Sequence, residues 1–213
     1  FVISYIYIMN TVDKLVEFFR EFPGIGPRQA KRFVYYLLSR NGGYLENLAK
    51  LILELKRDIK NCPSCFRFFP GDASRSPLCS TCTDTKRDGS SLMILARDVD
   101  FETIEKSHFY KGYYFILGGT VPILEKEPDK KIRSKELTAA VKRRAGEGLK
   151  EIIIATSVNP EGENTTTFIE KLLSPIVTEF NIKISGLGRG LSTGTELEYS
   201  DSDTIKNALK NRS

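Results

Sequence analysis

The N-terminal third of the chain repeats its apolar residues at the spacing of one helical face. The pattern predicts three helices, the first ending before Pro23-Gly24, the second beginning at Pro27, and the third covering about residues 44–59. Proline suits the first turn of a helix, and Gly42-Gly43 ends the second one. The apolar positions are Val12, Leu15, Val16 and Phe19, then Ala30, Phe33, Val34 and Leu37, then Leu45, Leu48, Ile52, Leu55 and Ile59.

From about residue 90, short β-branched and aromatic runs alternate with helical patterns. The run Glu151–Thr156 (EIIIAT) is typical of a buried parallel strand, because such strands are covered on both faces. This alternation predicts βαβ units, and therefore an α/β fold with helices on both faces of a sheet. The other predicted elements are strands at Leu92–Ala96, Tyr113–Leu117, Ile182–Ser185 and Glu196–Tyr199, and helices over about 134–149, 164–180 and Asp203–Asn211.

All four cysteines lie in an irregular segment, residues 61–83, that is rich in proline, glycine and serine. Two Cys-x-x-Cys pairs, Cys62 with Cys65 and Cys79 with Cys82, are separated by thirteen residues. Each pair can supply two thiolates from a tight turn, and four thiolates complete the tetrahedral shell of Zn²⁺. A shell filled by protein leaves no position for water, so we expect one structural zinc ion per chain. The alternatives are free or redox-active thiols, or an iron–sulfur cluster.

The string Phe22-Pro-Gly-Ile-Gly-Pro27 joins the first two predicted helices. Gly24 and Gly26 allow backbone amides to approach a phosphate without side-chain obstruction, and the following helix N-terminus adds positive potential. Arg28 and Arg32 lie one turn apart just beyond the glycines, where both can contact a DNA backbone. The pattern resembles a helix–hairpin–helix, a sequence-independent DNA-binding motif. The alternative is an ordinary helix connection with solvated arginines.

Composition and charge add few constraints on the fold and function. The 213 residues are 40% hydrophobic, which is ordinary for a globular protein of one large or two small domains. The formal net charge of +5 suits a polyanionic partner without identifying one. Residues 1–8 are apolar but too short for a membrane span or a signal peptide. We therefore expect a natural start at Met9 and a cytoplasmic protein that does not associate with membranes.

The order of these parts resembles the RecR family. The string PGIGPRQAKR (residues 23–32) is similar to that family's hairpin, and EIIIAT followed by Glu161-Gly162-Glu163 is similar to its Toprim domain. RGLSTGTELEY (residues 189–199), followed by DTIKNAL, resembles its C-terminal segment. The resemblance covers residues 10–213. It implies a helix–hairpin–helix region at 9–60, a four-cysteine zinc finger at 61–83, a Toprim domain at 90–185, and a C-terminal segment at 186–213.

The resemblance also implies a function and partners. RecR proteins assemble as a ring-shaped homo-tetramer that can encircle DNA, and they act with RecO, and in many bacteria RecF, to load RecA onto single-stranded DNA. By resemblance, the DNA contacts are Arg28 and Arg32 with the Gly24 and Gly26 turn. Glu161 and Glu163 are the expected partner-binding residues. Two parts of the chain depart from the family. One is the charged segment 121–133, and the other is Ala96, at a position where the family usually has a glutamate.

The positions that bind metal in catalytic Toprim domains hold other residue types in this chain. Catalytic Toprim domains hold Mg²⁺ through a Glu after the first strand and an Asp-x-Asp after a later strand. Here these positions are Ala96, Ser157 and Asn159. Asp98 and Asp100 are nearby, but a shift of register in a strand would turn them to another face. We therefore expect no enzymatic activity.

Other catalytic patterns are missing from the sequence. His108 is the single histidine, which excludes most histidine-based triads, and no phosphate-binding Gly-x-x-x-x-Gly-Lys-Ser/Thr loop occurs. We interpret His108 as a surface side chain, or as one whose hydrogen bonds are satisfied within the fold. The leading hypothesis is a non-enzymatic recombination mediator. The alternatives are a Toprim-type metal-dependent nuclease or primase-like enzyme, and a zinc-dependent DNA-binding adaptor without recombination partners.

Overall fold

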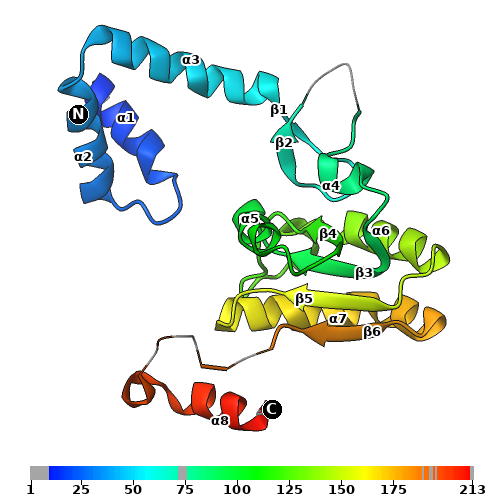
Figure 1. Cartoon of the computed structure of the whole chain (residues 1–213). Coiled ribbons are helices and arrows are strands. Elements are labelled where there is room, and N and C mark those ends of the chain that lie inside the picture. The colour runs from blue at the N-terminus through cyan, green and yellow to red at the C-terminus, as the bar shows by residue number, and fades with distance from the viewer. Residues whose placement is uncertain (1–9, 72–75, 189, 192–193, 195, 212–213) are drawn as a thin grey trace, which may run out of the picture. The chain divides into compact units, whose positions relative to one another are not determined.

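The computed structural model describes residues 10–71, 76–188, 190–191, 194 and 196–211 (Figure 1). The chain divides after Asp58 into two compact units. The expected start at Met9 lies outside the described residues, as do Arg189, Ser192, Thr193 and Thr195 of the C-terminal string. Among the described helices, none combines the length and the apolar character that are needed to cross a membrane.

The first unit contains the three predicted helices, α1 (Thr11–Arg20), α2 (Pro27–Leu38) and α3 (Gly42–Asp58). Asn10 caps α1, because its side-chain oxygen accepts a hydrogen bond from the Asp13 amide at 2.9 Å. The apolar face of α2 packs on α1, burying Ala30 and Val34. The rings of Phe19 and Phe33 meet edge to face, with centroids 5.7 Å apart. The predicted apolar stripes of α1 and α2 therefore form the core of this unit.

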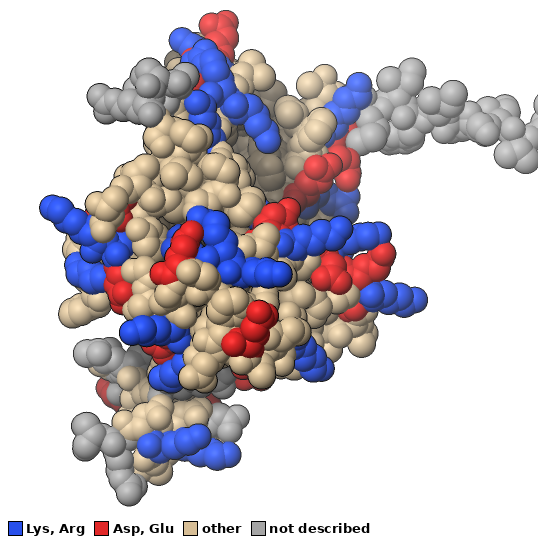
Figure 2. Space-filling model, turned by 90° about the vertical axis from the view of Figure 1, so that its right-hand side faces the viewer, with Lys and Arg blue, Asp and Glu red and all other residues tan. Residues whose placement is uncertain are grey.

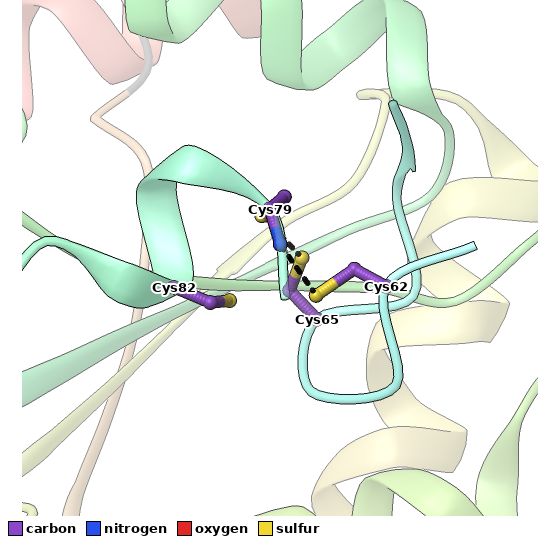
Figure 3. A group of neighbouring side chains, drawn as sticks. All are labelled: Cys62, Cys65, Cys79 and Cys82. Carbon is purple, nitrogen blue, oxygen red and sulfur yellow. Dashed lines mark hydrogen bonds between the residues drawn. The ribbon is translucent and has the colours of Figure 1, made fainter. Parts of the chain in front are cut away.

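The second unit begins with a small module that has little regular structure. It contains a two-stranded antiparallel hairpin, β1 (Ile59–Asn61) and β2 (Phe68–Pro70), and one helical turn, α4 (Ser80–Thr83). The four cysteines lie on this module (Figure 3).

A four-stranded sheet forms the body of the second unit. All its strands are parallel and have the order β4-β3-β5-β6. The strands are β3 (Asp88–Leu95), β4 (Gly112–Ile116), β5 (Glu151–Ala155) and β6 (Lys183–Gly186), and the helices are α5 (Asp98–Ser107), α6 (Ser134–Gly146), α7 (Pro160–Phe180) and α8 (Ser202–Lys210), with 3₁₀ turns at Pro128–Lys130 and Leu197–Tyr199. The predicted α/β fold is confirmed.

Each face of the sheet has its own core. On one face, Leu92, Ile94 and Ile152 pack with apolar residues of α6 and α7, such as Leu137 and Leu173. On the other face, Met93, Leu95, Tyr114 and Ile116 pack against Phe101 of α5. Because side chains alternate along a strand, β3 contributes to both cores, which explains its continuous apolar run. The face of the molecule drawn in Figure 2 carries interspersed basic and acidic side chains.

Several sequence-based expectations were wrong or incomplete. Gly42-Gly43, expected to end the second helix, instead begins α3, and α2 ends at Leu38. The segment Glu196–Tyr199, predicted as a strand, forms a 3₁₀ turn in which the Tyr199 amide donates to the Glu196 carbonyl at 3.1 Å. Leu197 and Tyr199 are exposed, so no core holds this segment extended. The helix α7 begins at Pro160 rather than at 164, because the Asn159 side chain caps it by accepting from the Gly162 amide at 2.7 Å.

Gly162 provides a test of the close packing between the first turn of α7 and the loop before it. A Cβ atom at this position would lie 1.9 Å from the backbone oxygen of Ser157, a contact that requires the backbone to move. We predict that Gly162→Ala lowers the free energy of unfolding by about 1–3 kcal/mol, measured by urea denaturation. Gly146→Ala is the matched control, because Gly146 is also helical and a Cβ there meets open space. Equal stability of the two variants would contradict this account of the α7 N-terminus.

Candidate functional site

The four cysteines come from two tight turns. Cys62 and Cys65 lie on the loop between β1 and β2, where the Phe66 amide donates to the Cys62 carbonyl at 2.8 Å. Cys79 and Cys82 lie at α4, where the Cys82 amide donates to the Cys79 carbonyl at 3.0 Å. Each turn directs two sulfur atoms toward the same point (Figure 3).

The spacing of the sulfur atoms fits a tetrahedral metal ion. All four lie within 4.8 Å of one another, and the sulfurs of Cys65 and Cys79 are 3.6 Å apart. Zinc–sulfur bonds of about 2.3 Å place tetrahedral ligands roughly 3.8 Å apart. The Cys79 amide also points at the Cys62 sulfur, at 3.5 Å, as expected for a sulfur that carries negative charge. The cluster can therefore hold one metal ion, and its all-thiolate ligand set fits zinc.

The electrostatics of the cluster also favour a cation. Hydrogen bonding, first of all with the Cys65 side chain, lowers the pKa of Cys62 below its usual value. The same interaction with Cys62 raises the pKa of Cys65, and burial adds to the rise. Without a cation, some of the four thiols therefore lose their protons more readily than usual while their neighbours retain them. A divalent metal ion removes this conflict, because it stabilises all four thiolates together.

The cysteine module is attached to the sheet through side chains and backbone. The Ile116 amide of β4 donates to the Cys65 carbonyl at 2.8 Å, and the ring of Phe66 lies 5.2 Å from that of Phe115. On the other side of the sheet, the guanidinium of Arg67 lies 4.4 Å above the ring of Phe101. A metal ion bound by the cysteines would therefore also position residues that contact both faces of the sheet.

Arg144 is a further residue near the cluster that sequence reasoning missed. It is 7% exposed, and its guanidinium lies 4.1 Å above the ring of Tyr113. Burial lowers the pKa of Arg144, while its attraction to Cys82 acts in the opposite direction. Arg144 follows Ala140 and Val141 on the buried face of α6, but an arginine at such a position gives a weak sequence signal for burial, because most arginines are solvated.

The predicted hairpin lies between α1 and α2. The Ile25 amide donates to the Phe22 carbonyl at 3.0 Å, and Gly24 has φ +76°, a conformation that favours glycine. Space around Gly24 and Gly26 is open, because a Cβ atom at either would meet nothing within 4 Å. Gly26 is the N-cap of α2 and provides no side-chain cap. The end of this helix is therefore accessible to a ligand.

The α2 N-terminus offers free hydrogen-bond donors. Within the described residues, the amides of Arg28 and Gln29 have no acceptor, whereas the Ala30 amide already bonds to the Gly26 carbonyl at 3.0 Å. The side chains of Arg28 and Arg32 are exposed, one turn apart. In the described part of this unit, the ion pairs join Arg20 to Glu17 and Arg57 to its acidic neighbours, so neither hairpin arginine is paired there. Amides and arginines at one helix end suit an anion.

The sheet edge that holds metal in catalytic Toprim domains has a different composition here. Ala96 follows β3 directly and is 3% exposed, while Ser157 and Asn159 follow β5. Because β3 and β5 are neighbouring parallel strands, these positions share one edge of the sheet. Within the described residues, the cysteine cluster is the only group of three or more potential ligands close enough to hold a metal ion.

Asp98 and Asp100 make structural hydrogen bonds. One carboxylate oxygen of Asp98 accepts from the Phe68 amide of the cysteine module at 2.7 Å. The carboxylate of Asp100 accepts from the Arg97 amide at 3.0 Å, which caps the start of α5. Both carboxylates are therefore directed toward backbone donors. The helix α5 itself had no counterpart among the predicted elements.

The expected partner-binding residues lie in the first turn of α7. Glu161 is half-buried and accepts a hydrogen bond from the hydroxyl of Thr120, whereas Glu163 is exposed. The neighbouring Thr165 hydroxyl accepts from the Val121 amide at 2.8 Å, so the segment beginning at 121 is attached to α7. The structure therefore separates the two glutamates, one directed inward and one outward. His108 is exposed after α5, as predicted for a surface residue.

Three protein families match successive parts of the chain. Residues 12–56 match the RecR helix-hairpin-helix family, residues 90–186 match the Toprim domain family, and residues 190–213 match the RecR C-terminal family. Several relatives carry the name Recombination protein RecR. The relative from Bifidobacterium longum subsp. infantis is 34% identical over 203 residues, which cover 95% of this chain and 96% of the relative.

Two further relatives come from other bacteria. The protein from Lactococcus lactis subsp. cremoris is 32% identical over 207 residues, covering 97% of this chain and 98% of its own. The protein from Dehalococcoides mccartyi is 33% identical over 204 residues, covering 95% and 94%. The similarity thus extends through the hairpin, the cysteine module, the parallel sheet and the C-terminal segment, and the chain belongs to the RecR family.

Proposed function

We propose that this protein is a non-enzymatic, sequence-independent DNA-binding mediator of recombinational repair. Its membership of the RecR family and the names of its relatives support a role in recombination. In the finer form of the proposal, the protein acts in the cytoplasm with RecO, and with RecF where that protein is present, to help load RecA onto single-stranded DNA. A homo-tetrameric ring would allow several hairpins to contact one DNA molecule, and linked contacts raise the overall affinity.

The observation that carries the proposal is the α2 N-terminus. Unpaired backbone amides, an open Gly24–Gly26 turn and two exposed arginines converge where a helix has its positive end. Amides and guanidinium groups recognise phosphate oxygens, which are present in every DNA sequence. We therefore propose that Gly24, Gly26, Arg28 and Arg32 contact the DNA backbone and read no bases.

The sheet supports a non-catalytic role. Ala96 has no ligand atom, and neither Ser157 nor Asn159 offers the carboxylate that Mg²⁺ prefers. Asp98 and Asp100, the acidic residues closest in sequence to Ala96, accept hydrogen bonds from backbone amides. These contacts argue against the alternative of a Toprim-type nuclease with rearranged ligands.

We propose that the metal is one structural Zn²⁺ per chain, bound by Cys62, Cys65, Cys79 and Cys82. Four protein thiolates leave no open position for chemistry, so zinc would stabilise the module rather than act on DNA. For partner binding we propose Glu163, the outward-facing acidic residue of the pair. Glu161 would act indirectly, because its hydrogen bond with Thr120 connects α7 to the loop after β4.

We predict that the double variant Arg28→Ala/Arg32→Ala binds every DNA sequence more weakly and with a lower salt dependence. Each lost phosphate contact should reduce the slope of log K against log salt by about 0.9 for duplex DNA. The measurement is fluorescence anisotropy with several unrelated duplexes at a series of salt concentrations.

A matched control separates the hairpin from net charge. Lys50→Ala/Lys56→Ala removes two exposed positive charges from α3 in the same unit. Its slope should remain close to that of the unmodified protein. Equal losses in both double variants, or a strong preference of the unmodified protein for one sequence, would contradict the proposed contact surface.

We predict that the purified protein does not cleave DNA or synthesise primers in the presence of Mg²⁺, because the described residues contain no carboxylate set that could bring the ion to a phosphate. Supercoiled plasmid and single-stranded templates are incubated with Mg²⁺ and compared with reactions containing EDTA. Activity that co-purifies with the protein and disappears in Asp98→Asn or Asp100→Asn would establish the enzymatic alternative instead.

A further inference from the structure

The outward face of α2 carries tyrosines beyond the two hairpin arginines. Tyr35 is 56% exposed and Tyr36 is 46% exposed, and Tyr44 at the start of α3 is 42% exposed. The solvent face of a helix is ordinarily polar or charged, so half-exposed aromatic rings on α2 and at the start of α3 suggest a surface with a ligand.

Tyr36 and Tyr44 are held in place by Arg40. The Arg40 guanidinium lies 4.3 Å from the Tyr36 ring centroid and 5.6 Å from that of Tyr44. Arg40 also donates a hydrogen bond to the Tyr36 hydroxyl, and the two rings meet edge to face with centroids 6.4 Å apart. The Tyr44 amide donates to the Asn41 side chain at 2.9 Å, which fixes the start of α3. The cluster is therefore ordered before any ligand binds.

The Tyr35 side chain, by contrast, is not held by its neighbours. Within the described residues it makes no ring contact and no side-chain hydrogen bond, although an aromatic ring of this size ordinarily packs. It follows Arg28 by seven residues and Arg32 by three, which places all three on one helical face. At a rise of 1.5 Å per residue, Tyr35 lies about 10 Å along the axis from Arg28. The phosphate-binding end of α2 thus continues into an aromatic surface.

We infer that Tyr35, together with the Tyr36–Arg40–Tyr44 cluster, forms a stacking site for the bases of single-stranded DNA. This inference rests on the proposed DNA-binding function of the hairpin and extends it to the form of DNA that is preferred. Bases in a duplex are covered by their neighbours, whereas bases in a single strand can stack on tyrosine rings and on an arginine plane. Every base has an aromatic face, so such a site is tolerant of sequence.

The charges on this face favour nucleic acid over a protein partner. Arg28, Lys31 and Arg32 precede the rings on α2, and the first turn of this helix contains no acidic residue. A row of cations that leads into aromatic rings matches a polyanion with attached bases. Tyrosine and arginine are also common in protein interfaces, and the experiment therefore includes that outcome.

The experiment compares single-stranded and duplex DNA with the full-length, metal-loaded protein. The probes are a fluorescent oligo(dT) and a duplex of equal length. Tyr35→Ala should weaken binding of the single strand by about 5- to 100-fold, the value expected for loss of one stacked base. Duplex affinity and the salt slope should not change, because a phenol ring contributes no phosphate contact. Tyr35→Phe should retain the affinity for the single strand.

Two controls make the result specific. Phe109→Ala removes an aromatic side chain that is 92% exposed in the second unit, and it should leave binding of both probes unchanged. Light scattering reports the molar mass of each variant.

The chain contains nine tyrosines and no tryptophan, so quenching of tyrosine emission by oligo(dT) gives an independent signal. This quenching should be smaller in Tyr35→Ala.

The possible failures are distinguishable. If Arg28→Ala/Arg32→Ala weakens binding but Tyr35→Ala does not, the hairpin function stands and the stacking site is wrong. If Tyr35→Ala weakens single-strand and duplex binding equally, or lowers the molar mass without a specific loss of oligo(dT) binding, the face is a structural or protein contact and the inference is overturned. If neither variant has an effect, the proposed DNA-binding surface itself fails.

Discussion

Four sulfur atoms hold together a segment that has almost no other core. In the described part of the cysteine module, the buried apolar side chains are those of Cys62, Cys65, Cys79 and Phe69, with Leu78 and Cys82 packed beside them. Hydrophobic burial on this scale does not fix two short strands and a single helical turn, and we propose that metal coordination supplies the remaining stability. The module in turn contacts both faces of the sheet, through Phe66 and Arg67. The order of the cysteine module, and of its contacts with the sheet, is therefore expected to depend on the metal.

The Asp98 carboxylate connects the cysteine module to the proposed non-catalytic role of the sheet. A carboxylate beside a sheet edge can bind Mg²⁺ only if its oxygens point toward the edge and find partners there. Asp98 instead accepts the Phe68 amide of the cysteine module, and its neighbour Asp100 caps α5. Ala96, Ser157 and Asn159, which stand at the positions of the catalytic ligands, offer no carboxylate. The chemistry available to the chain is consequently concentrated on α2, where amides, arginines and tyrosines suit binding rather than bond cleavage.

Sequence periodicity predicted the helices of the first unit and the strands of the sheet, because their apolar positions are regular and strongly patterned. It missed α5, whose apolar packing rests on Phe101 and Ile104 in a segment with many charges. It wrongly predicted a strand at Glu196–Tyr199, since an apolar–polar alternation does not reveal whether a neighbouring strand exists. The Gly-x-Gly turn identified the accessible amides of the hairpin. The roles of Asp98 and Arg144 depend on contacts between distant segments, which no local pattern encodes.

The dependence on the metal can be measured most directly by hydrogen–deuterium exchange of the protein before and after chelation, together with metal analysis. The account predicts one zinc ion per chain. After its removal, amide protection should fall throughout residues 59–71 and 76–84 and at Ile116, while the separate α1–α2 unit keeps its protection. Cys65→Ser should show the same loss without chelation, and Ser64→Ala, a change within the same loop that removes no ligand, should not. Absence of zinc, or an unchanged exchange pattern after complete removal of metal, would contradict the account.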